Sequence, residues 1–305
     1  MDEISAVHMY SLENFLDILT LPDNIPIILL ITMLISYTWI GFYKAFNNDK
    51  RIANGQPVWE GEPYNQEKVH TWPNLLNIEF IVAILVMAGL TLWSTFLNAP
   101  LEEPANPSVT PNPSKAPWYF LGLQEMLVYF DPWIAGVILP SIIITGLVAI
   151  PYIDTNPKGN GYYCWKDRKF AISVFMFGWL LWVALIILGT FLRGPGWNFF
   201  MFGEYWDAHK VVPLVNINFY ELLNIDPKTP WFIREIPAVA LTLAYFSIIP
   251  FVVAKLNKKF FDDLGLVRYS VTIILLLLLA SLPIKMVLRL TLNLKYLIVT
   301  PWFNI

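Results

Sequence analysis

The stretch with the most potential for chemistry contains the aromatic residues Trp118, Tyr119 and Phe120, followed by Gln124 and Glu125. Aromatic rings can wall an apolar slot for a flat ligand, whose orientation is then fixed by a few polar groups. Tyr119 offers a hydroxyl, and a carboxylate such as Glu125 can accept a proton from a bound group. Two other interpretations stay open: the rings can form an interfacial aromatic belt, and Glu125 can be an ordinary solvated carboxylate.

A short helix is expected to carry these residues. Pro117 suits the first turn of a helix, because its missing N–H costs nothing there. Asp131 stands before Pro132, and a residue before proline is disfavoured in the α region. The helix would therefore have roughly 14 residues and lie at the membrane surface with its aromatic residues at the start. The prolines between positions 100 and 117 predict a stiff, extended segment before it.

The composition is that of a membrane protein. Of the 305 residues, 56% are hydrophobic and only 14% are charged, whereas soluble domains carry about 25% charged residues. The net charge of −3 comes without a basic tract, so we expect no nucleic-acid partner. Cys164 is the only cysteine, which argues against a disulfide framework or a thiolate-bound metal. Residues 1–24 hold five acidic residues and no Lys or Arg, unlike a cleavable signal peptide.

Uncharged apolar runs predict an all-α integral membrane protein with about six transmembrane helices. The surface helix lies between the second and third of them. Each of the first five runs can supply the roughly 20 residues that a crossing requires. The sixth is shorter and can span only if Arg268 and Lys285 snorkel outward. The expected spans are 24–43, 80–101, 132–153, 170–192, 236–254 and 269–284.

The distribution of basic residues predicts the orientation. Twelve of the 20 Lys and Arg residues border the first, third and fifth connections, which are therefore expected on the cytoplasmic side. Both termini and the surface helix would then lie on the outer side of a bacterial inner membrane.

The histidines argue against a haem held by this chain. Axial ligands of a membrane b-type haem lie inside helices, whereas His8, His70 and His209 all fall in predicted connections. No Cys-x-x-Cys-His motif occurs, so a c-type haem is not expected either. We also expect no resident metal.

Residues 78–192 resemble the C-terminal half of cytochrome b in bc-type quinol–cytochrome c complexes, a half that forms the separate subunit IV in many of them. The spans predicted between 80 and 192 match three helices of that family. Residues 116–121, Ala-Pro-Trp-Tyr-Phe-Leu, stand where the family has its Pro-Glu-Trp-Tyr loop. The resemblance suggests an extra helix with a cytoplasmic connection at 1–77, a subunit IV-like core at 78–192, and an outer amphipathic loop with two further helices at 193–305.

The resemblance implies a haem-free subunit that completes the outer quinol-oxidation site of a bacterial bc-type complex, an oxidoreductase that is not active as this chain alone. Quinol or quinone would bind at the interface with a haem-bearing cytochrome b N-terminal subunit. Electrons would pass through a Rieske iron–sulfur protein and b haems to a c-type cytochrome, with protons released outside. Membrane lipid is the remaining expected partner. The alternative is a structural anchor subunit with a degenerate, inactive quinol site.

The family's loop glutamate is thought to take a proton from quinol, but this chain has Pro117 at that position. Glu125, eight residues later, is the hypothesised replacement, and Glu204 is the next candidate. The implied quinol-binding residues are Trp118, Tyr119, Phe120, Leu121 and Gln124, and the implied catalytic residues are Tyr119 and Glu125.

Four residues outside this stretch have simpler interpretations. His209 is interpreted as a surface histidine rather than a ligand, and Cys164 as a buried or interfacial thiol. Lys285 and Arg289, four residues apart on one helix face, are interpreted as snorkelling residues at the end of a span. Binding of lipid headgroups or of a partner is the alternative for this pair.

Overall fold

The computed structural model of the chain describes residues 20, 25–62, 70–98, 106–108, 110, 112–200, 213 and 215–305. These residues form helices and connections, with isolated β-bridges but no strand among them. Six helices in the described ranges are long and apolar enough to cross a membrane. The chain is therefore an all-α, multi-pass membrane protein, as the sequence predicts.

The helices extend beyond several of the predicted limits. Two of them begin with a π-helical turn, Thr71–Leu75 before α4 and Ile134–Ile138 before α6. A third π-helical turn, Leu188–Leu192, ends α7. The long helices are α3 (Ile25–Ala53), α4 (Leu76–Phe96), α6 (Leu139–Ile153), α7 (Lys169–Ile187), α10 (Ile236–Leu256) and α11 (Lys258–Leu292).

Contacts divide the chain into two compact units. The first contains the described residues up to 110 together with 157–174. In it α3 continues ten residues past its predicted end, because polar groups of its last turns have partners. Asn48 is fully buried, and its Nδ2 donates to Glu60 Oε2 at 2.7 Å and to the Tyr163 carbonyl at 2.9 Å. The Asp49 carboxylate accepts from the Lys166 N–H at 3.0 Å. A search for uncharged apolar runs cannot detect these last turns of α3, because they contain polar residues.

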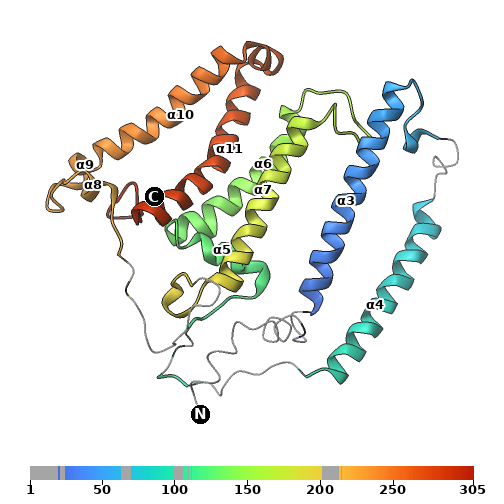
Figure 1. Cartoon of the computed structure of the whole chain (residues 1–305), viewed down its shortest axis with the longest axis horizontal. Helices are drawn as coiled ribbons and strands as arrows, with labels where there is room; N and C mark the ends of the chain where they lie inside the picture. Colours follow the sequence, from blue (N-terminus) through green and yellow to red (C-terminus); the bar gives the residue numbers. More distant parts are fainter. Residues whose placement is uncertain are drawn as a thin grey trace. The chain divides into compact units, whose positions relative to one another are not determined.

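The second unit contains the described residues of 111–156 and 175–305. In it α10 and α11 form a hairpin around Asn257, whose side chain accepts from the Phe260 N–H and so caps α11 (Figure 1). The Tyr245 hydroxyl donates to the Leu277 carbonyl at 2.8 Å and the Tyr269 hydroxyl to the Pro250 carbonyl at 2.5 Å. These bonds between the helices fix their register.

The interpretation of Lys285 as a snorkelling residue at the end of the sixth span is wrong. α11 bends at Gly265, where φ is 71°, and then continues to Leu292. Lys285 therefore lies within the helix rather than at its end. Its side chain is only 7% exposed, so it does not snorkel outward. Arg268, by contrast, is exposed and donates to the Tyr152 carbonyl at 2.9 Å.

Candidate functional site

The helix predicted between the second and third spans exists and is shorter than predicted. It is α5 (Trp118–Met126), with Pro117 at its N-cap. After Met126 the chain tightens into turns, in which the Tyr129 N–H donates to the Met126 carbonyl. Asp131 does not end α5; its carboxylate accepts from the Trp133 N–H and so begins the next helix.

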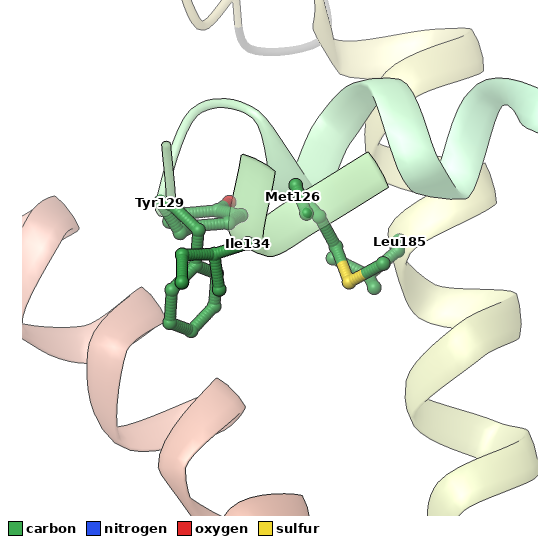
Figure 2. Packing of buried hydrophobic residues seen from close by; sticks show 6 residues of the cluster. Met126, Tyr129, Ile134 and Leu185 are labelled. Atoms are coloured by element: carbon green, nitrogen blue, oxygen red, sulfur yellow. The ribbon is translucent and has the colours of Figure 1, made fainter. Parts of the chain in front are cut away.

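A buried apolar cluster fixes the end of α5. Met126, Tyr129 and Ile134 are buried together, with Leu185 of α7 fully buried beside them. Figure 2 shows the Met126 side chain lying against Leu185, with Tyr129 close to Ile134. The end of α5 is therefore packed on α7 and on the start of the third span. Such packing restricts its movement relative to both.

Glu125 lies at the centre of this junction and is completely buried. The Arg193 guanidinium, itself 4% exposed, donates from Nη2 to Glu125 Oε1 at 2.7 Å and from Nε to Oε2 at 3.0 Å. This is the bidentate geometry in which an arginine–carboxylate pair is strongest. The pair joins α5 to the end of the fourth span.

Two aromatic side chains complete the carboxylate's surroundings. The Tyr129 hydroxyl donates to Glu125 Oε1 at 2.7 Å, and the Trp197 indole N–H donates to Oε2 at 3.0 Å. Burial, followed by the charge of Glu125, raises the pKa of Tyr129. Burial alone would lower the pKa of Arg193, but its hydrogen bonds with Glu125 and the negative charge there raise the pKa overall. Tyr129 therefore stays a neutral donor and Arg193 a cation.

The interpretation of Glu125 as a solvated carboxylate is wrong. Four charged or polar donor groups, two of them on the guanidinium, meet its two oxygens. The role of Glu125 as a catalytic base stays a prediction, and the geometry makes it a structural centre as well.

The predicted quinol-binding residues whose side chains the structure describes differ in exposure. Tyr119 and Phe120 are each about half exposed, and their ring centroids lie 4.6 Å apart. Leu121 is 2% exposed and packs against Gly189 at the end of the fourth span. The side chain of Trp118 lies outside the described part of the structure. Tyr119 and Phe120 thus form an open aromatic pair, and Leu121 anchors the helix.

Gln124 ties α5 to the segment before it. Its Oε1 accepts from the Ala116 N–H, and its Nε2 donates to the Ser114 carbonyl, both at 2.7 Å. Lys115 donates to the Thr190 carbonyl at 2.7 Å. Burial lowers the pKa of its ammonium group to about 8, although the negative charge of Glu125 acts to raise it. Gln124 also lines an open cavity of about 360 Å³. Gln124 therefore both links α5 to the preceding segment and lines this cavity.

Gly189 offers a test of this docking. A Cβ at Gly189 would lie 3.0 Å from Leu121 Cγ, so Gly189→Ala is expected to push α5 outward and cost about 1–3 kcal/mol. Thermal unfolding of the purified protein measures this effect. Gly89→Ala is the matched control, because its Cβ would meet no atom within 4 Å. Equal unfolding temperatures in the two variants would contradict tight packing of Leu121 on Gly189.

Sequence reasoning missed the partners of Glu125. The i, i+4 spacing of Glu125 and Tyr129 is a usable signal for a shared helix face, although α5 itself ends between them. Arg193 is a single basic residue directly after an apolar span, a position that by itself indicates only topology. Trp197 gives no signal of its own, because a hydrogen bond across 72 residues depends on the fold.

The remaining predictions concern Cys164, the residues of 201–212 and a metal site. Cys164 is a buried free thiol, and burial raises its pKa, followed by the charges of Asp167 and Asp49. His209, Glu204 and other residues of 201–212 lie outside the described residues. Within the described ranges, no three His, Cys, Asp or Glu side chains are grouped as metal ligands.

Comparison with known proteins gives one positive result. Residues 104–202 match the family described as cytochrome b (C-terminal)/b6/petD, and this segment contains α5, its preceding loop and Arg193. No solved structure matches the chain. The family supports a role in a bc-type complex and in membrane electron transport. Over residues 104–202 the chain is thus similar to the cytochrome b C-terminal/b6/petD family, the family that the sequence resembles.

Proposed function

We propose that this chain is a haem-free subunit that completes the outer quinol-oxidation site of a bacterial bc-type complex. The observation that carries the proposal is α5 itself, which lies within the family match and presents Tyr119 and Phe120 as an exposed aromatic pair. Apolar rings with a few polar groups suit a quinol ring. Tyr119 supplies a hydroxyl at this surface.

The support beneath α5 fits such a role. A binding surface needs rigid backing, because small displacements of a bound ring are costly in rate. The Glu125–Arg193 pair and the contact between Leu121 and Gly189 supply that backing. Trp118, Phe120, Leu121 and Gln124 remain the proposed quinol-binding residues together with Tyr119, with Leu121 acting from beneath.

The remaining parts of the reaction belong to partners. A cytochrome b N-terminal subunit would supply the b haems, and a Rieske protein and a c-type cytochrome would receive electrons. The quinol would bind at the interface, and its protons would leave on the outer side. Both termini of this chain would lie on that side of the bacterial inner membrane, in contact with lipid.

A second candidate function is a structural anchor with an inactive quinol site. Two observations favour it: Pro117 offers no acid, and both oxygens of Glu125 already accept hydrogen bonds from Arg193, Tyr129 and Trp197. In this case α5 would serve only to hold subunits together.

Gentle purification of the intact complex tests both candidates. We expect a b-type haem spectrum in the complex, a separate haem-bearing subunit, and quinol oxidation that Tyr119→Ala slows strongly. A complex that contains haem but oxidises no quinol, and retains no quinone, would favour the anchor. A b-type haem ligated by two histidines of this chain would contradict the proposal.

A further inference from the structure

Lys285 is a buried cation in α11, about two turns before the end of the helix at Leu292. It is 7% exposed, and its Nζ has no hydrogen-bond partner among the described residues. The ion pairs found in this part of the chain join other residues, namely Arg193 with Glu125 and Arg234 with Glu235. An isolated buried ammonium group is costly, because it loses its hydration without compensation.

Two further cations lie in the same region, and neutral groups serve as their partners. Arg289, one helical turn after Lys285, donates to Asn216 Oδ1 at 2.6 Å and to the Asn293 carbonyl at 2.8 Å. Lys295 donates to the carbonyl of Leu127 at 3.1 Å. Neither makes an ion pair with a carboxylate within the described residues.

Arg289 lies one helical turn after Lys285 on α11, and Arg289 and Lys295 line the same cavity, so the three cations are grouped in one region. Outside the span, burial and the positive charge of Arg289 lower the pKa of Lys295, and Asp131 acts in the opposite sense. Asp131 is otherwise engaged with Asn304 and with the Trp133 N–H. The region therefore has an excess of positive charge.

An open cavity of about 360 Å³ gives access to this charge. Arg289 and Lys295 line it, and its other polar side chains are Gln124 and Asn216, neither of them acidic. Leu127, Val128 and Trp197 supply the apolar part of the lining. A lining with two cations, two amides and no carboxylate is suited to an anion that has an apolar or neutral portion.

We propose that this cavity is a binding site for a phosphate group, held by Arg289 and Lys295, with the buried charge of Lys285 one helical turn from Arg289 adding to the attraction. The guanidinium fork of Arg289 matches phosphate oxygens, and the ammonium groups act as point charges. The phosphate can come from the headgroup of an anionic phospholipid or from free inorganic phosphate. Lys285, Arg289 and Lys295 all lie outside the family match at 104–202.

The test uses the full chain, purified in detergent and chloride buffer, with thermal unfolding as the measurement. A ligand that binds only the folded state raises the unfolding temperature, and the rise grows with the logarithm of the ligand concentration relative to Kd. Titrations with phosphatidylglycerol and with inorganic phosphate distinguish the two sources. A rise with the lipid alone assigns the site to a headgroup, and a rise with inorganic phosphate shows that the phosphate group is sufficient.

Lys285→Met is the main variant, since it keeps the length of the side chain and removes its charge. We expect a higher unfolding temperature without ligand, because a buried unpaired cation is lost, and an apparent affinity weakened by about tenfold or more. Lys295→Gln, outside the span, should also weaken binding if Lys285→Met fails to fold. Lys228→Met, an exposed lysine of the same unit, is the control and should respond like the unaltered protein. No ligand-dependent rise in the unaltered protein, or equal rises in all variants, would overturn the proposal.

Discussion

Arg193→Ala is expected to destabilise the protein by about 3–5 kcal/mol, because it leaves the fully buried Glu125 carboxylate without its counter-charge. The Tyr129 and Trp197 donors remain, but neutral hydrogen bonds do not replace a bidentate guanidinium. Denaturant unfolding of the purified protein, followed by tryptophan fluorescence, measures the loss.

Arg51→Ala is the matched control. Arg51 also pairs with a glutamate, Glu62, but the two side chains are 25% and 24% exposed. Solvent screens such a pair, so its removal should cost less than about 1 kcal/mol. A loss for Arg193→Ala no larger than that of the control would mean that the Glu125 junction contributes little to stability.

Glu125→Gln is expected to slow quinol oxidation by at least tenfold, a modest share of the roughly 10²–10⁴-fold that a positioned base typically contributes. The structure adds a second cause for the same result. The amide leaves Arg193 buried and unpaired, so α5 can move even if Glu125 never accepts a proton. Steady-state rates in the intact complex, with their pH profile, measure the effect.

A double variant separates the two causes. Glu125→Gln with Arg193→Gln removes both charges and leaves two amides that can hydrogen-bond to each other. If Glu125 is the proton acceptor, the double variant stays as slow as Glu125→Gln. If Glu125 only positions α5, the double variant recovers much of the rate. An unchanged rate and pH profile in Glu125→Gln itself would remove both roles, and Glu204 would be tested next.

The all-α membrane class and the existence of six spans follow from the amino-acid sequence without the structure. In a bilayer, a run of roughly 20 apolar residues can satisfy the hydrogen bonds of its backbone N–H and C=O groups within itself only as a helix. This inference therefore needs no tertiary information. The sequence also located α5, because Pro117 is a local signal for a helix start. The limits of α3 and α11 were harder to predict, since the hydrogen bond from Asn48 to Tyr163 and the burial of Lys285 depend on segments distant in the sequence.

The place of Glu125 within the fold depends on contacts between segments that are distant in the sequence. Its partner Arg193 lies 68 residues away, and its partner Trp197 lies 72 residues away. Helical spacing can show which residues share a face, but it cannot show which segment packs on that face. The same limit applies to Leu121, whose burial against Gly189 follows from the docking of α5 on the end of the fourth span. From the sequence, the Glu125 carboxylate is expected to be solvated. It can be buried in the structure because the fold brings the Arg193 guanidinium into contact with it.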